Sequence, residues 1–452
     1  MTLSNGFYKQ LVVSLDRGNP EEIRELFDEL HSYDQAQFLL KLDQEQRKKM
    51  LQYLGDEELA EITQELEYEQ QQVLIEEMGN TRSAKVLVEM SSDDAADLLG
   101  DMEEEKKQEI LRLINDEESA DMRELMKYPD NTAGGIMTTE YIVLPKHYTA
   151  EETVKKLREI APDAETVYYL YVVDEEDKLL GVLSLRELII ASPEITIDEI
   201  MYERVVSVPV DMDQEEVANI MEKYDFLAVP VVDERQHLVG IITVDDAVDV
   251  MKDEASEDMA KFGGISGKDS GVMDLSVTSF EAAKKRIPWL VLLLGIGIVA
   301  GNIIHQFEET LEAVWVLAIF IPMIADMAGN TGTQSLAVVV RGLATGQFQG
   351  RDAFRLIKRE AGVGILIGLT NGILISLIAG IWQQSMALGF VIGMSLSISL
   401  FFATLAGTIV PLIMVKLKVD PAVASGPFIT TVNDILGLTI YFSIATAFMS
   451  YL

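Results

Sequence analysis

The 452-residue sequence contains no cysteine and only four histidines. Without cysteine the chain can form no disulfide, bind no zinc through thiolates and use no cysteine nucleophile. It also lacks a Gly-x-x-x-x-Gly-Lys-Ser/Thr loop, which argues against ATP hydrolysis. Its first residues do not place a basic stretch before an apolar one, so no signal peptide is predicted, and the N-terminal part is expected in the cytosol.

Basic residues are scarce in the first 280 residues. Residues 281–452 hold nine acidic and ten basic residues, so the other 65 acids and 26 bases give residues 1–280 a net charge of −39. This excess argues against nucleic acid as a partner, because phosphates are bound by Lys and Arg. Most of these acids can be explained as a solvated surface. The alternative is that a minority cluster to bind hard cations such as Mg²⁺ or Ca²⁺, which prefer oxygen ligands.

Charged residues are absent from residues 361–415, a run of 55 residues that suits two membrane helices with a turn at 382–385. Three further apolar segments each hold at most one charged residue: 287–304, 313–340 and 421–452. The sequence therefore predicts five membrane helices. Lys and Arg gather in alternate loops, which predicts a cytoplasmic N-terminus and an extracytoplasmic C-terminus.

Two acids lie within the predicted spans. A carboxylate near mid-membrane costs roughly 3 kcal/mol and tends to face a bundle interior or a water-filled path. Asp434 has Thr430 and Thr431 about one turn earlier; the alternative to a path is a protonated side chain bonded to a neighbouring helix. Asp326 precedes residues 329–332, Gly-Asn-Thr-Gly, which are predicted to interrupt the helix beside a cavity or in buried protein. A simple packing kink is the alternative there.

One intramembrane carboxylate per chain suits a hydrated divalent ion. Mg²⁺ keeps several of its waters and is often bound through one or two carboxylates. A two-fold dimer would place two copies of Asp434 about one axis, and together they would neutralise the ion. Five helices are also few for a pore within one protomer. Both points predict a homodimer.

An internal duplication occupies residues 137–262. YVVDEEDKLLGVLSLREL (171–188) matches PVVDERQHLVGIITVDDA (230–247) at an offset of 59. Each copy predicts a strand–helix–strand–strand–helix unit, which resembles the CBS domain, and tandem CBS pairs are regulatory modules that often bind adenosine nucleotides. The pair is therefore a candidate site for ATP, with Tyr169, Arg186 and Phe226 where such a ligand would be held.

The duplication is flanked by helical segments. Residues 1–130 predict short stacked helices in a small superhelix. Residues 243–264 predict a long acidic helix that stops at a Gly-Gly pair. Its acids lie on one face and beside it, where like charges destabilise a helix unless cations bind; a solvated face is the alternative. They are Asp246, Asp249, Asp253, Glu254, Glu257 and Asp258.

The order of these segments and several sequence motifs resemble those of MgtE, the bacterial Mg²⁺ channel family, over about residues 20–452. The most specific segments are YPDNTAGGIM (128–137), TVDDAVDVMKDEASED (243–258), AGNTGTQSLAVVVRGLATG (328–346) and DPAVASGPFITTVNDILGLTIYF (420–442). We expect a multidomain membrane protein with an all-α N domain (1–130), an α/β CBS pair (131–250), a connecting plug helix and linker (251–280) and a five-helix transmembrane domain (281–452).

The resemblance implies a homodimeric, Mg²⁺-selective channel of the bacterial inner membrane, with Asp434 at the pore carboxylate. It also implies that cytosolic Mg²⁺ bridges acids between the N domain, CBS pair, plug helix and membrane part. The ligands carried over by motif are Asp93, Asp97, Gly135 (through its carbonyl), Asp213, Glu215, Asp225, Asp246, Asp249, Glu254, Glu257, Asp258 and Asp420, and Glu61 is a further N-domain acid expected to join them. The place of Asp326 in this pattern stays open.

Three other functions stay open at this point. The first is an ion-coupled transporter of another divalent metal such as Co²⁺ or Zn²⁺, although no Cys or intramembrane Met/His cluster favours a soft metal. The second is a membrane enzyme with Asp326 and Asp434 as an acid pair, although no nucleophile or metal-binding His motif accompanies them. The third is a CBS-containing sensor that is merely anchored in the membrane. No enzymatic activity is expected.

Overall fold

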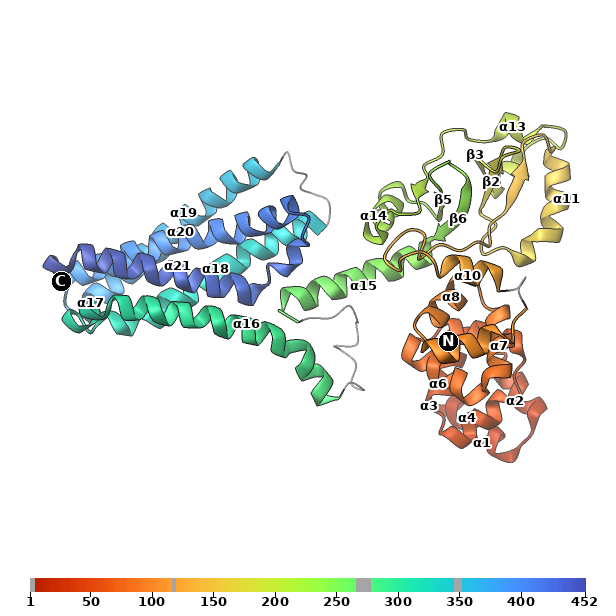
Figure 1. The fold of residues 1–452 in the computed structure, drawn as a ribbon, viewed down its shortest axis with the longest axis horizontal. Coiled ribbons are helices and arrows are strands. Elements are labelled where there is room, and N and C mark those ends of the chain that lie inside the picture. Colours follow the sequence, from red (N-terminus) through yellow and green to blue (C-terminus); the bar gives the residue numbers. More distant parts are fainter. Residues whose placement is uncertain (1–4, 116–118, 266–277, 345–351) are drawn as a thin grey trace. The chain divides into compact units, whose positions relative to one another are not determined.

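The computed structural model describes residues 5–115, 119–265, 278–344 and 352–452, whose helices and strands are traced in Figure 1. The chain divides into two compact units, Met1–Met251 and Lys252–Leu452. The last two residues of the motif at 328–346 and most of the predicted linker lie outside the described residues.

Within the described residues, ten short helices build the N-terminal part of the first unit; Figure 1 traces them in red to orange. Asp43 caps α4 by accepting the Gln46 N–H at 2.9 Å, and Gly79 separates α6 from α7 with a φ of 75°, which glycine adopts freely. α5 packs on both α3 and α7, and α7 packs on α9, so the helices stack in succession as predicted. They are α1 (Asn5–Arg17), α2 (Pro20–Phe27), α3 (Ser32–Lys41), α4 (Gln44–Leu51), α5 (Asp56–Gln64), α6 (Tyr68–Met78), α7 (Asn80–Glu89), α8 (Ser92–Gly100), α9 (Glu104–Leu111) and α10 (Ala120–Leu125).

Two three-stranded sheets follow, ordered β1-β2-β3 and β4-β5-β6. In each, the first pair of strands is parallel and the second antiparallel, with a register shift near the end of the antiparallel pair. Strands β5 and β6 begin 59 residues after β2 and β3, which confirms the predicted duplication. The elements are β1 (Val143–Pro145), α11 (Ala150–Ile160), η1 (Ala161–Asp163), β2 (Tyr169–Val173), β3 (Leu179–Ser184), α12 (Leu185–Ile190), α13 (Ile197–Ile200), β4 (Val208–Pro209), α14 (Gln214–Tyr224), β5 (Ala228–Val232) and β6 (Leu238–Thr243).

The acidic helix α15 (Val244–Phe262) ends just before Gly263, as predicted. Long apolar helices form the second unit, and the turn between α19 and α20 lies at 383–385, also as predicted. The remaining elements are α16 (Ser279–Gln306), α17 (Glu308–Ala313), α18 (Leu317–Ala344), α19 (Ala353–Trp382), α20 (Met386–Lys416), η3 (Pro421–Val423), α21 (Gly426–Ala447) and η4 (Met449–Tyr451).

Within the described residues, four helices have the length and hydropathy of a membrane span: α16, α19, α20 and α21. α18 is as long as α16, at 28 residues, but the polar residues in its middle leave it without an 18-residue window that is apolar enough. It packs against both α20 and α21. With α18 as the fifth long helix, the second unit has the helical architecture expected from the apolar runs.

The predicted interruption at residues 329–332 is wrong, because α18 continues through them. The glycines there serve close packing: a Cβ on Gly332 would collide with the Asn433 side chain of α21. The Thr331 hydroxyl donates to the Met327 carbonyl at 2.8 Å, so its polar group is satisfied within the helix. Small residues permit such close helix contacts in membranes.

Replacing Gly372 with Val is expected to separate α19 from α20. A Cβ at this position would meet the Ser397 hydroxyl and lie 2.6 Å from the Gly393 carbonyl oxygen. Overpacking of this kind costs about 1–3 kcal/mol, so the apparent Tm of the detergent-solubilised protein should fall. Gly362→Val on the same helix is the matched control, because nothing lies within 4 Å of the Cβ it would add. Equal melting of the two variants would contradict the packing argument.

Candidate functional site: acidic clusters and an intramembrane carboxylate

The N-terminal turn of α8 presents two adjacent carboxylates in different roles. Asp94 accepts hydrogen bonds from the Ser91 hydroxyl at 2.9 Å and the Gln64 amide at 2.8 Å, so it is held by protein donors. Asp93 has a buried oxygen, Oδ1, with no hydrogen-bond partner. A buried carboxylate oxygen without a partner is costly, and a cation or a proton would satisfy it.

α8 is capped from the linker that leads into the first CBS sheet. Its own N-cap residue, Ser91, makes no side-chain hydrogen bond to the helix backbone. Instead, the Ser92 N–H donates to Glu140 Oε1 at 3.0 Å, and the hydroxyls of Ser92 and Thr139 are 2.9 Å apart. A carboxylate at a helix N-terminus satisfies a free N–H and is favoured by the helix dipole. The N-terminal helices and the CBS pair are thereby joined at the acidic turn.

Acids from three segments of the first unit meet at this turn. Desolvation, followed by the charges of Asp94 and Asp246, raises the pKa of Asp93 well above its usual range. Desolvation and the neighbouring acids also raise the pKa of Asp97 to about 7, although its side chain reaches solvent. The same causes raise the pKa of Glu165 to about 7 and that of Asp246 to about 6. Each of these acids therefore lies where negative charge is already in excess.

Lowering the pH from 8 to 5.5 without divalent ions is expected to protect the first unit from protease. Asp97, Glu165 and Asp246 have pKa values of about 7, 7 and 6 when these elements are together, above the values near 4 of free carboxyl groups. The compact form therefore binds more protons and gains stability as the pH falls through 7 and 6. Limited proteolysis in EDTA at both pH values measures this, with an unfolded substrate correcting for the protease's own pH dependence. Faster cleavage at pH 5.5 would contradict it.

The structure brings Asp93, Asp97 and Asp246, which were predicted as ligands on separate elements, into one neighbourhood of the first unit. Sequence reasoning missed Glu140 and Glu165, which lie there too. Both act on this cluster through contacts between segments far apart in sequence. The only available signal was that Glu140 lies three residues after the segment 128–137.

The other predicted ligands of the first unit are more dispersed. Glu61 is exposed on α5, one turn before the Gln64 that binds Asp94. Asp213 is exposed and caps α14 by accepting the Glu215 N–H at 3.0 Å. Asp225 is exposed beyond α14, in a left-handed conformation with a φ of 54°.

Two further predicted ligands of the first unit lie on other elements. Asp249 is exposed, one turn after Asp246 on α15. Gly135 lies in the turn after Pro129 and donates its N–H to the Thr132 carbonyl. Across the described residues, no group of three or more His, Asp or Glu side chains is placed to hold one ion directly.

A second acidic cluster lies in the second unit, at the end of α15. Lys261 Nζ is 2.7 Å from Glu257 Oε1 and 2.6 Å from Asp420 Oδ2. Asp258 lies beside them; desolvation and the charge of Asp420 raise its pKa to about 6. Glu254 precedes this group by one turn and is half-buried. The predicted ligands at this end of α15 are thus grouped, with an ammonium among them.

In the apolar bundle, Asp434 on α21 is half-buried, and the carboxylate of Asp326 on α18 is close enough to repel it. Polar groups line the contact between these helices: the Thr333 and Thr430 hydroxyls are 3.3 Å apart. Asn433 is buried, with its side-chain oxygen unpartnered. α18 and α21 therefore present a polar seam within an apolar bundle.

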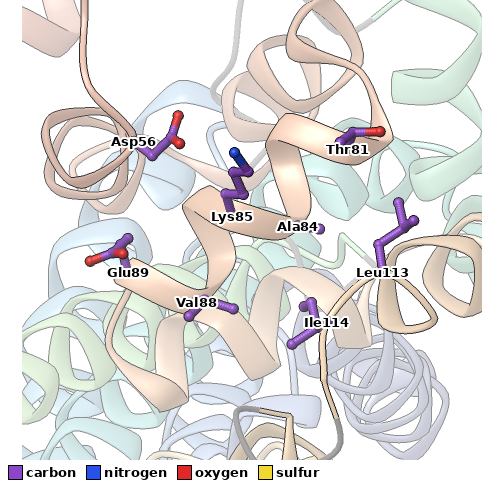
Figure 2. A pocket seen from close by; sticks show the side chains of 8 residues that line it. All are labelled: Asp56, Thr81, Ala84, Lys85, Val88, Glu89, Leu113 and Ile114. Carbon is purple, nitrogen blue, oxygen red and sulfur yellow. The ribbon is translucent and has the colours of Figure 1, made fainter.

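The candidate nucleotide residues occupy different surroundings in the CBS pair. Tyr169 on β2 is half-buried beside the core that includes Tyr171. Arg186 is exposed on α12, and Phe226 stacks on Tyr224 with ring centroids 5.4 Å apart. A separate cavity of 310 Å³ in the N-terminal helices contains none of the predicted ligands (Figure 2). Its lining residues are Asp56, Thr81, Ala84, Lys85, Val88, Glu89, Leu113 and Ile114.

Three family models match separate parts of the chain. The family model MgtE, described as a divalent cation transporter, matches residues 321–444, which include Asp326 and Asp434. The MgtE intracellular N domain matches residues 30–131, and the CBS domain matches 133–194 and 197–253.

The magnesium transporter MgtE of Enterococcus faecalis is 45% identical over 443 residues, covering 98% of this chain and 97% of that protein. The chain belongs to the MgtE family. Magnesium transporter MgtE of Bacillus subtilis is 51% identical over 325 residues, or 72% of this chain and 71% of that protein. MgtE of Thermus thermophilus is 45% identical over 322 residues, or 71% of each chain. The family is one of transporters rather than an enzyme class.

Two solved structures resemble the N-terminal part of the chain. The soluble part of a magnesium transporter aligns with a TM-score of 0.54 at 42% identity, covering 55% of this chain and 98% of that one. The cytosolic domain of the Mg²⁺ channel MgtE in complex with ATP aligns with a TM-score of 0.52 at 41% identity, covering 54% and 99%.

Proposed function

We propose that this protein is a Mg²⁺-selective channel that mediates magnesium uptake and is gated by cytosolic Mg²⁺. The observation that carries the gating proposal is the acidic turn of α8, where the unpartnered Asp93 oxygen lies among carboxylates that raise one another's pKa. Mg²⁺ is a hard cation and prefers such oxygen ligands. Relatives named as magnesium transporters support the choice of ion.

Asp434 would bind the permeating ion. Its half-buried carboxylate lies on the polar seam between α18 and α21. We infer a homodimer in which two such carboxylates neutralise one hydrated Mg²⁺ at the two-fold axis. The protein would be a multi-pass protein of the bacterial inner membrane, with the N-terminus cytoplasmic and the C-terminus extracytoplasmic.

The gate would respond to the cytosolic acids. At low Mg²⁺ the acids of α8, the CBS pair and α15 repel one another across distances comparable to the ~8 Å screening length, so these parts separate and α15 moves. At high Mg²⁺, ions bind to Asp93, Asp97 and Asp246 and to the remaining predicted acids. These bound ions favour the compact closed form. Shifting the population from 1:99 to 99:1 needs about 5.5 kcal/mol of differential binding. Several weak sites acting together can supply this.

ATP is the proposed nucleotide ligand of the CBS pair, with Tyr169, Arg186 and Phe226 as its candidate contacts. The support is the similarity to a cytosolic domain solved in complex with ATP. ATP would act on the gate through the acidic helix that follows β6, without being hydrolysed.

Single-channel recording of the reconstituted protein with Mg²⁺ varied on the cytosolic side tests the proposal. We expect unitary Mg²⁺ currents whose open probability falls as cytosolic Mg²⁺ rises. Protease cleavage of the cytosolic part should slow between zero and about 10–20 mM Mg²⁺, a range above that of weak carboxylate sites. Unchanged cleavage over this range would exclude the gating mechanism.

The alternative is an ion-coupled secondary transporter of a divalent metal such as Co²⁺. The pair of acids, Asp326 and Asp434, is the observation that favours it, because intramembrane carboxylates also serve as proton relays. Such a transporter would give saturating flux that depends on pH or Na⁺, without unitary currents.

A further inference from the structure

Lys261 is the one basic side chain that the structure places among the acids at the end of α15 in the described part of the second unit. Its ammonium bonds the carboxylate of Glu257, one turn earlier on the same helix, and that of Asp420, which precedes η3. The three side chains are 21–36% exposed, so the group is partly shielded from water. Lys261 thus joins α15 to the loop that follows α20.

The ammonium occupies oxygens that a divalent ion would need. Mg²⁺ coordinates oxygen at 2.0–2.1 Å in octahedral geometry, whereas Lys261 already donates to one oxygen of Glu257 and one of Asp420. A cation cannot approach the same two oxygens closely while the ammonium lies between them. Although desolvation opposes the charge on Lys261, its hydrogen bonds to Asp420 and Glu257 raise its pKa, so it stays protonated.

One ammonium leaves the cluster short of positive charge. Glu257, Asp258 and Asp420 carry three negative charges when ionised, against one positive charge on Lys261. Desolvation, followed by the charge of Asp420, raises the pKa of Asp258 to about 6 in spite of the lysine. A divalent ion would compensate the cluster more completely than the lysine does.

We propose that Lys261 is a tethered counter-ion that competes with Mg²⁺ for Glu257 and Asp420: it links them weakly, without fixing α15, when Mg²⁺ is scarce, and Mg²⁺ displaces it when it binds there. This inference rests on the proposed regulation by cytosolic Mg²⁺. Because the ammonium is fixed to α15, its effective concentration at the cluster does not change with the ionic composition of the cytosol. Lys261 therefore sets the Mg²⁺ concentration at which this end of α15 responds.

The proposal predicts opposite changes in the absence and presence of Mg²⁺. Lys261→Gln removes the link, so the backbone amides of residues 257–263 should exchange hydrogen at least about fivefold faster without Mg²⁺. It also removes the competitor, so the Mg²⁺ concentration that half-protects these amides should fall roughly three- to tenfold, the size expected for a partly exposed ion pair. Lys261→Arg keeps the charge and should restore slow exchange without lowering the midpoint.

The experiment is hydrogen exchange on the full chain in lipid nanodiscs, with Mg²⁺ as the only added divalent ion. Lys416→Gln is the matched control, because it removes an exposed lysine at the end of α20 that makes no ion pair found within the described residues. A Lys261→Gln midpoint that is unchanged or raised would overturn the proposal and leave Lys261 as a structural clamp. If the wild-type chain gains no protection from Mg²⁺ in any segment, the proposed regulation itself fails, and competition by Lys261 fails with it.

Discussion

Replacing Asp434 with Ala should reduce the Mg²⁺ current of the reconstituted protein by about 100-fold. An ion inside an apolar bundle needs a compensating charge, and an intramembrane charge is worth roughly 3 kcal/mol on insertion scales, which corresponds to about two orders of magnitude in occupancy. In a dimer the substitution removes both carboxylates at once. The measurement is single-channel or macroscopic current with Mg²⁺ as the only permeant cation.

Two matched variants separate loss of the charge from loss of the fold. Asp434→Asn keeps the size of the side chain and should lose current nearly as completely as Asp434→Ala. Thr439→Ala lies on the same helix at an exposed position, where its hydroxyl bonds only the Ile435 carbonyl in the described contacts, and should conduct normally. Full current in Asp434→Ala would remove the carboxylate from the conduction path.

The same measurement separates the competing functions. A membrane-anchored sensor or an enzyme would show no conductance to lose. An ion-coupled transporter would show saturating flux that depends on pH or Na⁺ and is abolished in Asp434→Ala. Asp326→Asn further distinguishes a transporter from a channel. A transporter that relays protons through an acid pair requires both carboxylates, whereas the channel proposal assigns the ion to Asp434 alone.

The sequence predicted the architecture well where the signal was local. Charge-free runs located the long helices, because a membrane span must satisfy its backbone internally and present apolar side chains. The 59-residue offset located both sheets, because strand boundaries follow the alternation of apolar residues and turns. The Gly-Gly pair correctly marked the end of α15.

Contacts between distant segments could not be predicted in this way. Residues 329–332 looked like a helix interruption because propensity is a local property, yet the neighbouring helices need glycine there for close packing. Glu140 caps a helix 48 residues earlier in the chain, and Lys261 bonds a carboxylate 159 residues later. Neither pairing leaves a periodic signal. The sequence indicated which acids are candidates, but their hydrogen-bond and ion-pair partners depend on tertiary contacts.

Neutralising three acids of the first unit together, Asp93, Asp97 and Asp246 to Asn, should make the cytosolic part compact without Mg²⁺. All three have pKa values raised by desolvation and by neighbouring acids. Bringing these elements together therefore makes each carboxyl easier to protonate than a free carboxyl group. Asn has nearly the same shape and is neutral at every pH. Removing the repulsion should therefore have the same effect as the proposed Mg²⁺ binding, which is to favour the compact closed form. The open probability should then stay low as cytosolic Mg²⁺ is removed.

The measurement is limited proteolysis of the full chain in nanodiscs containing EDTA. The triple variant should be cleaved as slowly as the wild-type protein is in about 10–20 mM Mg²⁺, and added Mg²⁺ should slow its cleavage little further. A control variant changes three exposed acids of the CBS pair (Glu151, Glu175 and Asp198) to their amides, which alters net charge equally away from the cluster. If the control is protected as strongly as the cluster variant, net charge rather than the acidic turn of α8 governs compaction. If the cluster variant is cleaved faster than the wild type in EDTA, these carboxylates stabilise the compact form by themselves, and the proposed gate has the wrong sign.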